Sequence, residues 1–344
     1  GKRRKMVDLT TNYMGLELKN PVIAGASKLT ANLDTIQQLE AAGASAIVCA
    51  SLFEEQIQLE RLKLEEATTD LNDMDAEMMS LFPEVEHGGP KEHLMWVEKT
   101  KKALSIPVIA SLNAVNPETW CEYAKMLQDT GVDGLELNFY YTPDSMEKDG
   151  KAVEDEQIRT LEEVKKAVNI PIGVKLSYFY SNPLSVIARM DKVGVDGFVL
   201  FNRLFESDID INEEEHAKPF NLSNPGDNKL SLRYLGLLYG NMNAKLCGNT
   251  GFLTGADIAK GILSGAAAIQ IVSALYIHDI AFLSSMLREL EGWMENKGYN
   301  KISDFQGKLA RKNVSDPFIY KRAQYVDLIL RSDELMMRPG TDKK

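Results

Sequence analysis

The chain has 344 residues, 44% of them hydrophobic, which suffices for one large α/β domain or two ordinary ones. Its 50 acidic and 39 basic residues give a net charge of -11, which opposes contact with phosphate backbones and anionic membranes, so we expect no nucleic-acid partner. No apolar run reaches the roughly 18 residues of a membrane span, so we expect no membrane partner and a cytoplasmic protein. Three widely spaced cysteines argue against disulfides, zinc and iron–sulfur clusters.

The first predicted element is an N-terminal hairpin from Val7 to Leu18. After it, a proline opens an apolar strand three times, in NPVIAGA from Asn20, IPVIASL from Ile106 and IPIGVKL from Ile170. Proline is tolerated at the first residue of a strand. We therefore expect a strand at each of these three places.

A second junction, in which a helix, a glycine and an apolar strand follow one another, recurs between the first ones. Its sequences are AGASAIV, TGVDGLEL, VGVDGFVL and SGAAAIQI. The glycines fit helix C-terminal stops and are Gly43, Gly131, Gly194 and Gly265.

Together with AKLCGN at 244–249, the two series predict strands beginning near residues 21, 45, 106, 133, 170, 196, 244 and 267. Strands that are apolar on both faces and alternate with helices form parallel sheets. Eight such βα units favour a closed (β/α)8, or TIM, barrel over an open sheet. We expect residues 1–344 to form a single domain.

The chain is longer than the roughly 250 residues of a typical barrel, so it carries additions. We expect insertions at 52–89 and 203–229 and a helical tail at 303–344. The first insertion is charged and partly amphipathic, which leaves three readings open: a solvated helix, an oligomer contact or a lid over the barrel mouth. We expect a homodimer.

Active sites of such barrels lie at the C-terminal ends of the strands, where this sequence is unusually polar. Alternation in IPIGVKLS turns Gly173 and Lys175 into the barrel, and alternation in DGLELN does the same for Glu136 and Asn138. We expect Lys175 and Glu136 to face each other. They would form either a buried structural pair or a cationic group that stabilises a negative charge in the reaction.

CGNTG (247–251) follows the seventh strand and VSA (272–274) follows the eighth. Loops at these places are a recurrent phosphate site of this fold, because glycine amides and a hydroxyl approach phosphate oxygens closely. The alternative is that Gly248 and Gly251 only shape a turn. The four histidines show no HxH or HExxH spacing, so we expect no metal.

With these motifs in this order, the chain resembles the FMN-dependent dihydroorotate dehydrogenases, in particular the soluble type. The resemblance runs from the hairpin through NPVIAGAS, LELN, IPIGVKL, CGNTGFLTG and AAAIQIVSAL to NKGYNKISDFQGKL. It implies a barrel that holds FMN noncovalently at its mouth. It also implies hydride transfer between flavin N5 and a small cyclic substrate, with dihydroorotate to orotate, a step of pyrimidine biosynthesis, as the default reaction.

The resemblance also implies roles for single residues. Gly25 and Ala26 would lie against the flavin ring, and Lys175 would reach its pyrimidine edge. Asn138 matches the asparagine that opens the family's N-L-S-C-P-N segment, and Asn202 resembles the substrate-side asparagine. The phosphate-loop positions are Gly248, Asn249, Gly251 and Ser273. A cation at the pyrimidine edge favours hydride acceptance by the flavin.

The chain departs from the family where the substrate would bind. Tyr141 stands where the family has its cysteine or serine base, and Ala50 stands where the soluble type has a second lysine. Ser80 stands where a glycine of the substrate loop is expected. The aromatic run from Phe139 to Tyr141 is expected over the substrate side of the mouth rather than in the core.

Tyrosine is a weaker starting point for a base than cysteine. Ordinary pKa values of about 10 and 8.5 make its ionisation at neutral pH roughly 2 kcal/mol less favourable, which a nearby Lys175 would offset. Tyr141 would then act as the base, donate a proton to an alkene, or only close the pocket. The alternatives to dihydroorotate oxidation are a different substrate with the same flavin, or a catalytically inactive barrel that binds flavin or a phosphate ligand.

Overall fold

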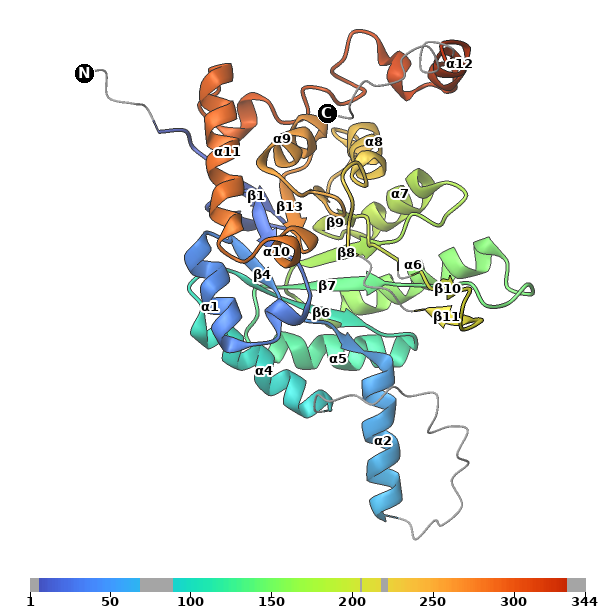
Figure 1. The fold of residues 1–344 in the computed structure, drawn as a ribbon. Coiled ribbons are helices and arrows are strands. Elements are labelled where there is room, and N and C mark those ends of the chain that lie inside the picture. The colour runs from blue at the N-terminus through green and yellow to red at the C-terminus, as the bar shows by residue number, and fades with distance from the viewer. Residues whose placement is uncertain (1–5, 69–88, 205, 218–221, 333–344) are drawn as a thin grey trace.

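The structure, a computed structural model, describes residues 6–68, 89–204, 206–217 and 222–332. Its centre is a closed barrel of parallel strands, whose last strand pairs with the first (Figure 1). In order of pairing the strands are β3 (Val22–Ala24), β4 (Ala46–Val48), β6 (Val108–Asn113), β7 (Gly134–Phe139), β8 (Ile172–Leu176), β9 (Gly197–Leu200), β12 (Lys245–Gly248) and β13 (Ala268–Ile271). The predicted (β/α)8 barrel is confirmed.

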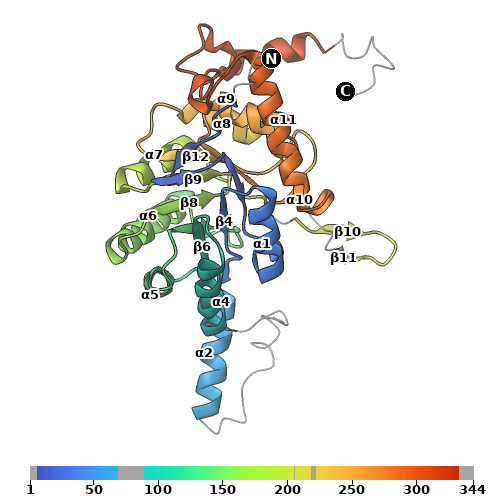
Figure 2. The same cartoon turned by 90° about the vertical axis from the view of Figure 1, so that its left-hand side faces the viewer.

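Helices cover the outside of the barrel (Figure 2). They are α1 (Leu33–Ala42), α4 (Pro90–Ala103), α5 (Pro117–Asp129), α6 (Gly150–Ala167), α7 (Pro183–Val193), α8 (Lys229–Leu238), α9 (Gly255–Ser264), α10 (Ser273–Ile277) and α11 (Phe282–Lys297). The predicted stops are confirmed, because Gly43 and Gly194 are left-handed C-caps and Gly131 and Gly265 also have positive φ. Only glycine adopts such a backbone without strain.

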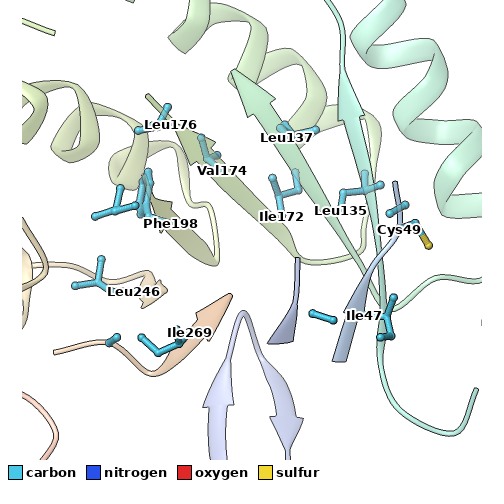
Figure 3. Packing of buried hydrophobic residues seen from close by; sticks show 14 of the residues in the cluster. Ile47, Cys49, Leu135, Leu137, Ile172, Val174, Leu176, Phe198, Leu246 and Ile269 are labelled. Carbon is cyan, nitrogen blue, oxygen red and sulfur yellow. The ribbon is translucent and has the colours of Figure 1, made fainter. Parts of the chain in front are cut away.

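Side chains alternate along each strand between the helices and the barrel interior. Leu135, Leu137, Ile172, Val174 and Leu176 are fully buried in the main hydrophobic cluster, together with residues of the surrounding helices. Figure 3 shows these leucines, isoleucines and valines around neighbouring strands. The residues between them in β7 and β8 are thereby turned inward, as the alternation predicts.

The N-terminal hairpin closes the bottom of the barrel, as its position before β3 allows. It consists of β1 (Thr11–Tyr13) and β2 (Leu16–Leu18), and the Thr11 hydroxyl donates to the Ala267 carbonyl oxygen at 2.8 Å. Tyr13 and Met14 at its tip are 1% exposed. A Cβ atom on Gly197 would lie 2.8 Å from the Tyr13 ring, so this inner position needs glycine.

The additions lie around this barrel. The first insertion begins with β5 (Leu52–Phe53) and α2 (Glu54–Thr68), and α2 points away from the barrel in both views (Figures 1 and 2). Ser80 and the rest of 69–88 lie outside the described residues. The second insertion forms the hairpin β10 (Asp208–Asp210) and β11 (Glu215–Ala217).

The tail contains the 3₁₀ helices η2 (Ile302–Asp304) and η3 (Pro317–Tyr320) and the helix α12 (Arg322–Leu330). The Arg233 guanidinium of α8 donates to the Tyr320 carbonyl oxygen at 3.0 Å and so ties η3 to the barrel. In the part of the chain that the structure describes, no helix combines the length and apolar character required to cross a membrane.

We predict that Gly197→Ala destabilises the protein. The added methyl group would overlap the buried Tyr13 ring, and overpacking of this kind costs about 1–3 kcal/mol. Urea unfolding followed by circular dichroism measures the change. The matched control is Gly292→Ala in α11, where a Cβ meets nothing within 4 Å and where alanine is the better helix former. Equal stability of Gly197→Ala and wild type would show that the hairpin does not fill the barrel floor rigidly.

Candidate active site

A cavity of about 610 Å³ opens at the C-terminal ends of the barrel strands. This volume lies in the usual range for cofactor sites. The predicted site residues that line it are Ala26, Lys175, Asn202, Asn249, Gly251 and Ser273. Six of its seventeen lining residues are thus among the predicted site residues.

Three other predicted residues do not line the cavity but lie next to residues that do. The Gly25 amide donates to the Ile271 carbonyl oxygen at 3.0 Å, and a Cβ on Gly25 would lie 2.8 Å from Val272. Gly248 ends β12 and has no room for a Cβ beside Ile269. Asn138 contacts Asn202, whose side-chain nitrogen donates to the Asn138 side-chain oxygen at 2.8 Å.

Lys175 is 6% exposed and lies at the inner end of the cavity. Its Nζ donates to Gln270 Oε1 in a long hydrogen bond of 3.5 Å, and Gln270 Nε2 donates to Glu136 Oε1 at 2.6 Å. The expectation that Lys175 and Glu136 face each other directly is corrected, because Gln270 of β13 stands between them. The register explains this: Lys175 pairs with Asn138, so Glu136 lies one level below.

The other end of the cavity offers anion-binding groups. Thr250 and Gly251 have positive φ values of 78° and 79°, and the Gly251 amide donates to Ser223 Oγ at 3.2 Å. The Ser223 amide in turn donates to Ser273 Oγ at 2.9 Å. A Cβ on Gly251 would lie 2.4 Å from the Asn228 nitrogen, so glycine is required there. Amides and hydroxyls gathered in this way suit a phosphate group.

Among the residues of the cavity wall that were not predicted from the sequence are Ser223 and the two cations Lys28 and Arg203. Ser223 lies in the second insertion, away from the barrel strands in the sequence. Only the turn residues that follow it distinguish this segment. Lys28 and Arg203 line the cavity beside Lys175, and the described lining residues include no carboxylate. Arg203 is held by an ion pair of 2.7 Å with Asp227. A signal for both cations existed, since each follows the end of a barrel strand closely.

The aromatic residues at the end of β7 and just after it differ in burial. Phe139 is 5% exposed and packs against Trp120 of α5 with ring centroids 5.0 Å apart, so its expected place at the mouth is wrong. Alternation explains this, because Asn138 faces inward and its neighbour faces the helices. Tyr141 lies two residues beyond β7, with Lys148 Nζ 5.6 Å from its ring centroid, and does not line the 610 Å³ cavity.

A second cavity of about 470 Å³ adjoins the first one and shares Ala26 and Lys28 with it. Its other walls include Ala50 after β4 and the aromatic side chains of Phe53 and Trp96. Ala50 stands where the resemblance implies a second lysine, so this part of the wall carries no charge from that residue. The space beside the first strand's loop is consequently less cationic than the resemblance implies.

The described part of the chain holds no cluster of three or more His, Cys, Asp or Glu side chains suited to a metal ion. A (β/α)8 barrel with glycine amides and hydroxyls suited to phosphate at one end of its mouth and a buried cation at the other is the arrangement expected of a class, the FMN-dependent barrel oxidoreductases.

Within that class the dihydroorotate dehydrogenase family model matches residues 8–294, and the chain belongs to this family. Members of the family are FMN flavoproteins that act on CH–CH bonds.

Individual relatives are distant but cover almost the whole chain. A dihydroorotate dehydrogenase B (NAD(+)) catalytic subunit of Thermoplasma volcanium is 27% identical over 88% of this chain and 98% of its own length. The protein of the same name from Thermoplasma acidophilum is 25% identical, over 89% and 100%. That from Methanocaldococcus jannaschii is 24% identical, over 84% and 94%.

The residues present fit FMN. The Ser273 hydroxyl accepts from the Ser223 amide and so keeps its own hydrogen for the phosphate. The Gly251 amide, which donates to Ser223 Oγ in this structure, would exchange that partner for the phosphate. Lys175 offers a cation for the pyrimidine edge of the ring. Both ends belong to one cavity, which is also lined by the apolar side chains of Phe252, Ile271 and Val272.

We predict that His93, on the wall of the 470 Å³ cavity, makes the protein acid-sensitive. Burial lowers its pKa to about 4, from an ordinary value of 6.5. The unfolded chain therefore takes up a proton that the folded chain refuses, and stability falls by about 3 kcal/mol as the pH falls from 6.5 to 4. His93→Gln should flatten this part of the profile of unfolding free energy against pH. An unchanged profile would contradict the assignment, and His216→Gln on the exposed hairpin is the control.

Proposed function

We propose that the chain is an FMN-dependent oxidoreductase that passes hydride between flavin N5 and a small cyclic substrate, with oxidation of dihydroorotate to orotate as the default reaction. The observation that carries the proposal is the 610 Å³ cavity, which joins the Lys175 ammonium to the Gly251 and Ser273 phosphate groups at the mouth of this family's barrel. FMN, when bound, supplies the hydride acceptor.

The chain's own residues would then hold and orient the reactants. Lys175 favours negative charge at the pyrimidine edge of the ring, because it is a buried cation. Asn202 donates its amide hydrogen to Asn138, which leaves its side-chain oxygen to accept a hydrogen bond from a ring N–H of the substrate. Lys28 and Arg203 place positive charge where a substrate carboxylate would bind.

We further propose that Tyr141 moves the substrate proton, as the residue at the position of the family's base. Tyr141 is the second residue after β7, so a rearrangement of this loop on ligand binding would bring the phenol to the mouth. The tyrosine and Ala50 together favour a second candidate function, in which the same flavin site oxidises or reduces a different cyclic substrate. A catalytically inactive flavin-binding barrel is the remaining alternative.

We propose that the protein acts in the cytoplasm as a homodimer. The relatives are named catalytic subunits, which favours association with a further subunit as well.

We predict that the purified protein is yellow and that dihydroorotate, added without oxygen, bleaches its flavin absorbance. The bleaching follows because hydride passes to the flavin and no acceptor is present to reoxidise it. A visible spectrum before and after the addition measures the result. Flavin that stays oxidised would exclude dihydroorotate and favour the second candidate function, and a colourless protein would exclude the flavin enzyme altogether.

We predict that Tyr141→Phe slows flavin reduction by substrate about 100-fold or more, because general-base catalysis contributes factors of this size. FMN content should be unchanged, since the phenol does not line the cofactor cavity. Stopped-flow absorbance of single turnovers measures the rate. Tyr325→Phe, at an exposed position of α12, is the control. A wild-type reduction rate in Tyr141→Phe would remove the residue from the chemistry.

A further inference from the structure

Three buried side chains form one chain of hydrogen bonds inside the barrel. Glu136 of β7, Gln270 of β13 and Lys175 of β8 are 2%, 1% and 6% exposed. Gln270 donates to Glu136 at 2.6 Å and accepts from Lys175 at 3.5 Å. Lys175 and Gln270 line the 610 Å³ cavity, whereas Glu136 lies beneath it.

The charged groups at both ends set the direction of this chain. An ionised carboxylate can only accept hydrogen bonds, so the amide group of Gln270 turns its NH2 toward Glu136. An ammonium can only donate, so the carbonyl oxygen of Gln270 points to Lys175. Glu136, which does not line the cavity, thereby helps to hold the residue to which Lys175 donates.

The buried carboxylate of Glu136 carries a free-energy cost. Among the described residues, its Oε2 atom has no hydrogen-bond partner, and neither has the hydroxyl of Tyr13 on the barrel floor. Burial raises the pKa of Tyr13 well above its ordinary value, and the nearby Cys247 and Glu136 raise it further, so the phenol stays neutral. A buried carboxylate with one unpartnered oxygen lowers stability, and a glutamine would avoid that part of the cost. The value of the negative charge therefore lies in its action on Lys175, which it reaches through Gln270.

We propose that Glu136 is a positioning residue which, through Gln270, orients Lys175 toward the cofactor and partly offsets its charge, and so lowers the reduction potential of the bound FMN. The proposal rests on the proposed function, because it requires FMN in the 610 Å³ cavity. Uncompensated, the buried Lys175 ammonium would favour the more negative, reduced cofactor strongly. With Glu136 in place, the reduced cofactor is easier to reoxidise.

The test is the midpoint potential of the bound FMN in Glu136→Gln, measured by equilibration with a reference dye. The variant keeps the shape of the side chain and removes its charge. We expect the ratio of reduced to oxidised FMN at a given potential to rise at least tenfold, which is about 30 mV for a two-electron couple. The loss of this counter-charge opposes the relief of the unpartnered oxygen, so the free energy of unfolding should change little. A purely structural role would change stability and leave the potential in place.

Two further variants complete the experiment. Gln270→Leu breaks both hydrogen bonds that link Glu136 to Lys175, so the potential should depart from the wild-type value. This variant also decides the question if Glu136→Gln does not fold. Glu215→Gln, on the exposed hairpin strand β11, makes the same change of charge far from the barrel interior and should leave the potential unchanged.

The outcomes separate this inference from the proposed function. If wild-type FMN is reduced by substrate but its potential is the same in both interior variants, only the role of Glu136 is overturned. A shift toward lower potential in Glu136→Gln would overturn it as well. A wild-type protein that binds no FMN would overturn both.

Discussion

The burial of the Lys175 ammonium inside the barrel is the constraint on which the site depends. Strand β8 places it there through alternation, because Ile172, Val174 and Leu176 face the helices while Gly173 and Lys175 face the interior. Gly173 leaves room for the hairpin tip that fills the barrel floor. One strand thus provides the helix packing, the floor and the cation at the mouth, so a register slip in β8 would remove all three.

The buried charge also explains the polar interior around it. A cation in a medium of low dielectric constant is stable only with hydrogen-bond acceptors and a counter-charge nearby. Gln270 provides the acceptor and Glu136 the counter-charge, although Glu136 comes from the neighbouring strand β7 and Gln270 from β13, three strands away. The cofactor end and the phosphate end of the cavity then differ in character: buried charge at one, backbone amides and hydroxyls at the other.

Much of this could be predicted from residue patterns. The glycine stops and proline starts located the barrel strands, and alternation turned Lys175, Glu136 and Asn138 inward. Contacts between distant segments could not be predicted in this way. Ser223 reaches Gly251 and Ser273 from an insertion, and Gln270 enters between Lys175 and Glu136, because barrel closure and register set these contacts.

Phe139 shows a different limit. Its place after a polar strand end suggested the mouth, whereas the period of two that placed Asn138 correctly also assigns Phe139 to the helix side. Local composition predicted the wrong position for Phe139, whereas the alternation of side chains predicts the right one. The place of Tyr141 lies beyond the strand, so periodicity says nothing about it, and only a ligand-bound state decides whether its phenol reaches the mouth.

The decisive measurement is a crystal structure of the protein with FMN bound. We expect the FMN phosphate within hydrogen-bond distance of the Gly251 amide and the Ser273 hydroxyl. We also expect Lys175 Nζ at the pyrimidine edge of the ring, still bonded to Gln270. FMN in the opposite orientation, or bound away from Lys175, would contradict this placement.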